Sequence, residues 1–171
     1  MILESIRAVA DALNSTSYGV NVQFDTMAFD GTDSAPPDIA VVADETRDNS
    51  VAVGRYPTTF PALVVTVDGD TVLDGEVVSD NRDGDISIII RYLTKNADTA
   101  EGNSETLYTL RAVQKCLRDF NSNTNVGDRV RNNIQIIECL KIEHLQLFEN
   151  ISDANITGGI RATFKVRDAQ P

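Results

Sequence analysis

The acidic residues between positions 68 and 76 are the first candidates for chemistry in this sequence. Four carboxylates fall within this short stretch: Asp68, Asp70, Asp74 and Glu76. Carboxylates gathered at one edge of a sheet can hold a divalent metal ion that supports hydrolysis. However, Asp-Gly between apolar runs is typical of a hairpin turn, and the stretch contains no histidine or lysine. We therefore favour a solvated hairpin and keep an acidic metal-dependent hydrolase as the alternative.

Spacing also disfavours a calcium loop and a histidine-based active site. The stretch Asp80–Asp85 has the composition of a calcium loop, but placing Gly84 at the required glycine puts Ile90 where a bidentate acid is needed. His144 is the only histidine, and the chain has no G-x-S-x-G nucleophile elbow. We therefore expect no catalytic residue, no metal site, no cofactor and no enzymatic activity.

Charge is distributed very unevenly along the chain. Residues 1–85 hold 16 acidic and 4 basic residues, a net charge of −12, whereas residues 86–171 hold 10 acidic and 11 basic residues, a net charge of +1. This balance argues against a basic nucleic-acid-binding surface, because duplex binding depends on neutralising phosphates. An acidic wall would instead let DNA pass without binding it.

The last predicted strand carries a basic stripe, which we define as Arg161, Lys165 and Arg167. These cations alternate with apolar residues, so they share the strand face opposite the core. A solvated outer face is one interpretation. The other is a head-to-tail contact with the acidic half of a neighbouring copy, with Asp44, Glu45 and Asp48 as candidate partners. On that interpretation, reversing Lys165 and Arg167 to glutamate weakens assembly without unfolding the domain.

Length and composition predict one domain spanning residues 1–171. The longest apolar runs are too short to cross a bilayer, and the first residues lack the pattern of a cleaved signal peptide. We therefore expect no membrane association and no secretion by a cleaved signal. Cys116 and Cys139 belong to no metal-binding pattern and are expected to be buried as free thiols.

The predicted elements indicate an α+β fold, with a mainly antiparallel sheet packed against two helices. The helices are Ile2–Leu13 and Glu105–Phe120, the second capped by Asn103 or Ser104. The strands are Ala62–Val67, Thr71–Ser79, Ile86–Leu93, Ile134–Leu147 and Gly159–Arg167. Ile86–Leu93 is apolar on both faces, so we expect an inner strand. The apolar positions of Ile134–Leu147 change parity, which predicts a bulge or a twist near His144.

The stretch from residue 25 to 59 is rich in Asp, Pro, Gly, Ser and Thr, with two short β-like runs at Ile39–Val42 and Val51–Val53. A hairpin and a long excursion are both compatible with this pattern. Because a packed domain rarely carries so long a connection without purpose, we expect an extended interaction loop or hairpin here.

This order of elements resembles the tail-terminator proteins of long-tailed bacteriophages. The resemblance lies in the helix Ile2–Leu13, the acidic loop, the strands Ala62–Val67 and Ile86–Leu93, the helix Glu105–Phe120 and the two closing strands. It covers most of the chain but rests on no diagnostic motif, and residues 25–59 are longer than in compact members. Other neck proteins have similar layouts.

The resemblance implies a structural protein of the virion, assembled in the host cytoplasm and placed at the head-proximal end of the tail. There it would form a homo-oligomeric ring, by analogy a hexamer, that ends polymerisation of the tube protein and joins the tail to the head connector or stopper protein. DNA would pass through the lumen. The alternatives are another head–tail connector protein, the metal-dependent hydrolase above, or a monomeric host-interaction module that binds through residues 25–59.

Overall fold

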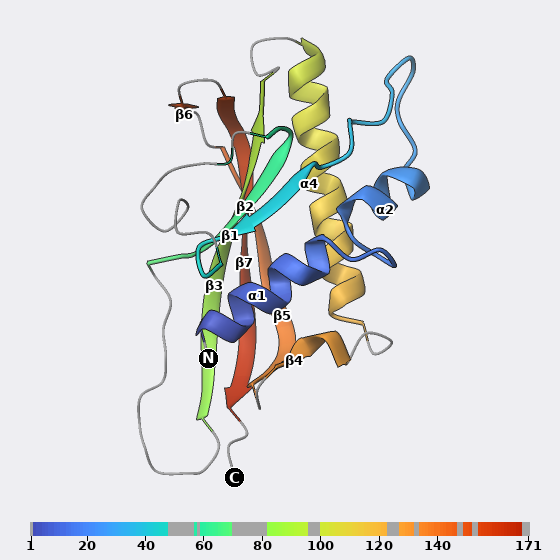
Figure 1. Ribbon diagram of the computed structural model, residues 1–171. Helices are drawn as coiled ribbons and strands as arrows, with labels where there is room; N and C mark the ends of the chain where they lie inside the picture. Colours follow the sequence, from blue (N-terminus) through green and yellow to red (C-terminus); the bar gives the residue numbers. More distant parts are fainter. Residues whose placement is uncertain are drawn as a thin grey trace.

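The computed structural model describes residues 2–47, 57, 59–69, 82–95, 100–122, 127–131, 134–146, 149–151 and 154–168. Three helices and seven strands lie within these ranges (Figure 1). In chain order they are α1 (Ile2–Leu13), α2 (Val20–Thr26), β1 (Val41–Asp44), β2 (Ala62–Val67), β3 (Arg82–Thr94), α4 (Ala100–Phe120), β4 (Val130–Arg131), β5 (Ile134–Leu145), β6 (Glu149–Ile151) and β7 (Ala154–Asp168).

The strands form one sheet in the order β1-β2-β3-β7-β5-β4, with β6 paired to the first residues of β7. The pair β1–β2 is parallel and every other pair is antiparallel. The predicted α+β fold with a mainly antiparallel sheet is therefore confirmed. The basic stripe belongs to β7, which lies at the centre of the sheet between β3 and β5.

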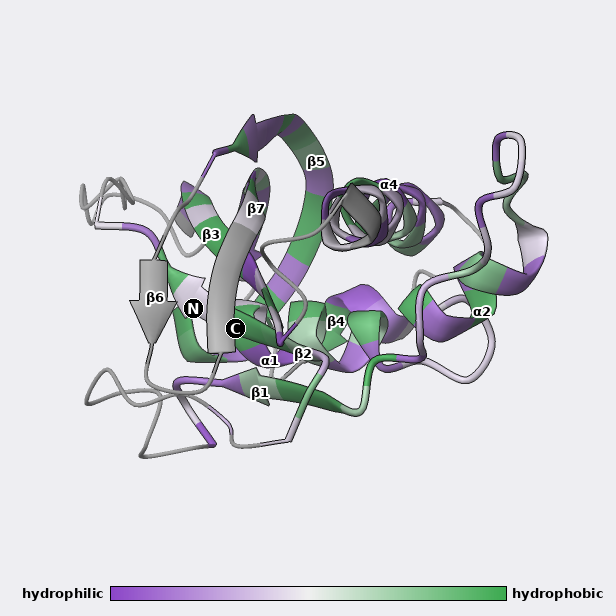
Figure 2. Ribbon diagram, turned by 90° about the horizontal axis from the view of Figure 1, so that it is seen from above, coloured by the Kyte–Doolittle hydropathy of each residue, from purple (hydrophilic) through white to green (hydrophobic). Residues whose placement is uncertain are grey.

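The helices α1 and α4 cover one face of the sheet, and α2 packs against α4 (Figures 1 and 2). Alternate residues of the central strands point into this layer because side chains of a strand alternate between faces. On β7 these are Ile160, Ala162, Phe164 and Val166, all fully buried. The ring of Phe164 meets that of Phe120 from α4 edge to face, with centroids 6.3 Å apart. The core is thus a helix-on-sheet layer.

Glu105 ties the first half of α4 to β3. Its carboxylate accepts hydrogen bonds from the hydroxyls of Tyr92 and Thr94, both buried. Burial, followed by the hydrogen bond to Glu105, raises the pKa of the Tyr92 phenol. Because the phenol stays protonated, it is a fixed donor to the carboxylate.

Several predicted elements are found at their predicted positions. The helix Ile2–Leu13 and the strand Ala62–Val67 have the predicted bounds. The strand predicted at Ile86–Leu93 is indeed an inner strand, although β3 begins earlier, at Arg82. Residues 82–85 were predicted as part of a turn, but they pair with residues 165–168 of β7. The predicted strand Thr71–Ser79 lies outside the described residues.

Two helical predictions were incomplete. The helix α4 begins at Ala100, so Asn103 and Ser104 lie inside it rather than at its cap. The short helix α2 was not predicted, because only Val20, Gln23 and Phe24 are buried in it and seven residues give a weak periodic signal.

The predicted bulge in β5 exists, but not near His144. Pairing with β7 shifts register between Ile136 and Glu138 and again between Cys139 and Lys141. Ile137 and Leu140 are therefore extra residues, and two bulges explain the change of parity. As a result, Leu140, which the pattern assigned to the apolar side, is 45% exposed.

The predicted loop at residues 25–59 is described as far as residue 47, and at 57 and 59. It includes the end of α2, an irregular stretch and β1. The first β-like run contributes to β1, which is an edge strand parallel to β2 and not half of a local hairpin. The second run, Val51–Val53, lies outside the described residues.

Candidate assembly surfaces

The basic stripe lies on the sheet face opposite the helices, as predicted. Arg161, Lys165 and Arg167 alternate with the buried residues of β7. The structure also shows what the sequence pattern omitted, namely which residues flank the stripe. Lys165 lies in register with Asp85 on β3 and with Glu138 on β5. Each cation of a central strand meets neighbours from two other strands.

Both arginines of the stripe pair with carboxylates of their own chain. Arg167 donates from Nε and Nη2 to the two carboxylate oxygens of Asp83, at 2.8 and 3.0 Å. This hydrogen-bonded arginine lowers the pKa of Asp83 below its ordinary value. Arg161 places Nε 2.5 Å from a carboxylate oxygen of Asp68, at the end of β2. The stripe is therefore largely neutralised within one subunit.

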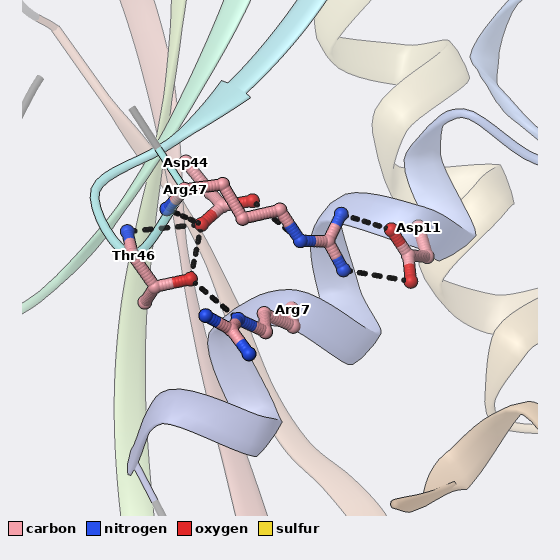
Figure 3. A network of polar contacts seen from close by, with 5 residues as sticks. All are labelled: Arg7, Asp11, Asp44, Thr46 and Arg47. Carbon is pink, nitrogen blue, oxygen red and sulfur yellow. Dashed lines mark hydrogen bonds and ion pairs between the residues drawn. The ribbon is translucent and has the colours of Figure 1, made fainter. Parts of the chain in front are cut away.

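Two of the proposed acidic partners also have roles inside the chain. The carboxylate of Asp44 is 3% exposed and accepts hydrogen bonds from the backbone N–H and hydroxyl of Thr46 and from the backbone N–H of Arg47 (Figure 3). Glu45 accepts a hydrogen bond of 2.7 Å from the backbone N–H of Val67 on β2. The third candidate, Asp48, lies outside the described residues.

The turn held by Asp44 is clamped onto α1 (Figure 3). Arg47 donates to both carboxylate oxygens of Asp11, at 2.5 and 3.0 Å, and Arg7 donates from Nε to the Thr46 hydroxyl at 2.9 Å. The hydrogen bond that Arg47 donates to the Asp11 carboxylate raises the pKa of Arg47 above its ordinary value. Together these contacts join the first helix to the edge of the sheet.

Among the described residues, no group of three or more histidine, cysteine or acidic side chains is arranged to hold a metal ion. Of the four acids first considered for a metal site, Asp68 is paired with Arg161 and the other three, Asp70, Asp74 and Glu76, lie outside the described residues. His144 is exposed on β5. None of the described helices is long and apolar enough to span a membrane.

Both cysteines are free thiols, as predicted. Cys116 is buried in α4, where burial raises its pKa, and Cys139 is half-buried on β5, where burial raises the pKa to about 11. A raised pKa keeps a thiol protonated and therefore poorly nucleophilic.

A groove between α4 and β5 was missed by sequence reasoning. It has a volume of about 320 Å³, and its lining residues are Gln114, Leu117, Arg118, Asn121, Cys139, Leu140, Lys141 and Ile142. Two basic residues and no acid occur in this lining. The groove could not be anticipated, because it depends on how α4 lies beside β5 and on the bulge that turns Leu140 outward.

No protein-family model matches the chain, and no curated protein aligns with it significantly.

Proposed function

We propose that the chain is a structural assembly subunit, the tail-terminator protein of a long-tailed bacteriophage. In this proposal, identical subunits form a ring at the head-proximal end of the tail tube. The ring ends polymerisation of the tube protein, contacts the head connector or stopper protein, and passes DNA through its lumen. The protein would belong to the virion and assemble in the host cytoplasm.

The observation that carries the proposal is the one-sided layering of the sheet. Among the described elements, α1 and α4 cover one face, and the opposite face presents a ladder of charges on β3, β7 and β5. A small α+β domain with one helical layer leaves a broad polar surface for contacts between subunits. The family named in the proposal comes from the resemblance in the order of the predicted elements.

The net charge of −11 supports the lumen part of the proposal. A surface with excess carboxylates repels the phosphate backbone, and that repulsion lets a strand pass without specific binding. A basic lumen would instead retain the DNA by releasing its counterions.

Negative-stain microscopy of the purified chain, alone and with tail tubes, tests the proposal. We expect closed rings, and rings seated on one end of each tube. A chain that remains as single particles at high concentration and never binds a tube end would refute the terminator assignment. Binding to a head connector without any contact to the tube would favour the alternative of another neck protein.

Calorimetric titration with Mg²⁺, Mn²⁺ and Ca²⁺ tests the hydrolase alternative separately. The proposal predicts no binding at millimolar metal, partly because Asp68 is already paired with Arg161. Tight binding of one metal ion per chain would instead favour the acidic hydrolase.

A further inference from the structure

The described surface contains a cationic strip that the charge ladder does not neutralise. It runs along α4 and consists of Leu107, Arg111, Gln114 and Arg118, which follow helical spacings of four, three and four and so share one face. Both arginines are exposed, and no ion pair joins either of them to a carboxylate among the described residues. On a chain of net charge −11, this strip is an exception.

The strip begins in the groove between α4 and β5, at Arg118 and Gln114, and continues along the exposed face of α4 to Arg111 and Leu107. Gln114 and Arg118 line the groove from the helix, and Leu140 and Lys141 line it from the strand. Leu107 is 66% exposed and Leu140 is 45% exposed, which makes them two of the four large apolar side chains exposed among the described residues. Lys141 also contacts Glu143, at 2.8 Å, so Arg118 is the lining cation that no ion pair joins to a carboxylate among the described residues. Exposed apolar side chains rimmed by cations are typical of a docking surface.

The β5 edge in this groove is not suited to adding another strand. It carries two bulges, and Asn121 and Arg129 already bond its backbone, at the N–H of Cys139 and the carbonyl of Ile137. Bulges and occupied backbone groups discourage edge-to-edge pairing. An occupant must therefore be held by side chains.

A segment with the complementary charge lies on the other side of α4. Residues 30–38 form an irregular, mostly exposed stretch that contains three aspartates, Asp30, Asp33 and Asp38, and two prolines. The hydroxyl of Tyr108 on α4 fixes the start of this stretch, through the backbone N–H of Asp30 and the carboxylate of Asp33. Asp30 and Asp38 are the pair left for an outside contact, because Asp33 is bonded to Tyr108. A turn joins Asp30 to Asp33. The five residue steps after Asp33 alone reach about 16 Å if extended, which exceeds the roughly 10 Å that separate Arg111 from Arg118 along the helix.

We propose that the groove between α4 and β5 binds the acidic segment 30–38 of a second copy of this chain. Leu107 and Leu140 would contact its apolar residues, and Arg111 and Arg118 its aspartates. A groove on one subunit and a segment on the next are different patches, so the contact is heterologous and repeats until a ring closes. The inference rests on the proposed function for the ring, but the contact itself holds for any self-assembly of this chain.

Charge swapping in the full-length chain tests this contact. The groove variant is Arg111→Glu with Arg118→Glu, and the segment variant is Asp30→Lys with Asp38→Lys, which keeps the bond between Asp33 and Tyr108. Each is expected to weaken association at least tenfold in sedimentation velocity, because like charges meet at the contact. Combining all four substitutions in one chain is expected to restore association. Circular dichroism checks that each variant is folded.

The basic stripe supplies the matched control. Lys165→Glu with Arg167→Glu makes the same change in net charge as the groove variant, on the opposite side of the sheet. We expect it to leave association within about threefold of wild type, because both cations already have acidic neighbours on β3. If this control abolishes association and the groove variant does not, the contact lies on β7 and the inference is wrong.

The remaining outcomes separate the groove from the ring. The groove contact is overturned if the wild-type chain stays monomeric at high concentration, or if the variant with all four substitutions does not regain association. A closed dimer that the groove and segment variants weaken and the combined variant restores would support the groove contact and refute the ring. Rings that form equally well in the groove variant and the segment variant would support the ring and refute the groove contact. Binding of a DNA oligonucleotide that the groove variant abolishes would assign the groove to nucleic acid instead.

Discussion

Replacing Asp44 by alanine tests whether this carboxylate is an internal support or a surface contact. The carboxylate is 3% exposed and accepts three hydrogen bonds from Thr46 and Arg47 in the turn after β1. Losing a comparable capping side chain costs about 0.5–2 kcal/mol, and leaving buried donors unsatisfied costs about 1–3 kcal/mol. Because Arg47 is exposed, water can reach part of the turn. We therefore expect Asp44→Ala to lower the free energy of unfolding by about 2 kcal/mol.

Two other variants serve as controls for this prediction. Asp11→Ala removes the exposed ion pair with Arg47, whose side chains are 43% and 41% exposed, and should cost less than about 1 kcal/mol. Asp44→Asn keeps one side-chain oxygen as an acceptor and should recover about half of the loss. Urea unfolding followed by circular dichroism measures all three. In a domain of this size the alanine variant should melt about 4–8 °C lower.

The result that contradicts this reasoning is a stable alanine variant. If Asp44→Ala unfolds within about 0.5 kcal/mol of wild type, the turn does not depend on its carboxylate. If that stable variant also associates more weakly, Asp44 acts between subunits, as the sequence pattern first suggested.

Three further perturbations follow from the pKa values and packing. Arg167 lowers the pKa of Asp83 in the folded protein. The stabilisation from this pair is therefore fully present above the pKa that Asp83 has in the unfolded chain, and it is lost as the pH falls through the lower pKa of the folded protein. Carbon-detected NMR should show this pKa rising toward its ordinary value in Arg167→Gln, and an unchanged value would exclude the pair in solution. Cys116 and Cys139 should react slowly with a thiol reagent at pH 8 and promptly in urea, because both pKa values are raised; rapid labelling of folded protein would contradict their burial. Gly158→Ala would place a methyl group 2.9 Å from a side-chain carbon of α4, so we expect the free energy of unfolding to fall by about 1–3 kcal/mol. An unchanged midpoint of denaturation would show that the helix can shift.

The fold was predictable wherever one face of a helix or strand is consistently apolar. Periodicity located Ile2–Leu13 and Ala62–Val67 at the bounds found in the structure, because burial on one face enforces a regular pattern. It failed at β5, where two bulges shift the pattern twice. It also placed a turn at residues 82–85, since Asp, Gly and Arg there resemble turn chemistry although their backbone pairs with β7.

The candidate site was less predictable because it depends on neighbours across strands. Sequence spacing placed Arg161, Lys165 and Arg167 on one face, and the structure agrees. It gave no information on Asp83 and Asp68, which lie 84 and 93 residues away from their partners Arg167 and Arg161 in the chain and meet them only through the register of the sheet. A charge pattern read along one strand therefore overestimates how much charge is available to another molecule.

The bulged edge of β5 limits how the protein can assemble. An uninterrupted strand edge is a template that any extended chain can copy, and copying of that kind has no natural end. Here the bulge residues Ile137 and Leu140 interrupt the regular hydrogen-bonding pattern of the edge. Asn121 and Arg129 form hydrogen bonds with two of its backbone polar groups. Growth through this edge into fibres is thereby discouraged, so the ring proposed above would have to form through side-chain contacts instead of strand pairing at this edge.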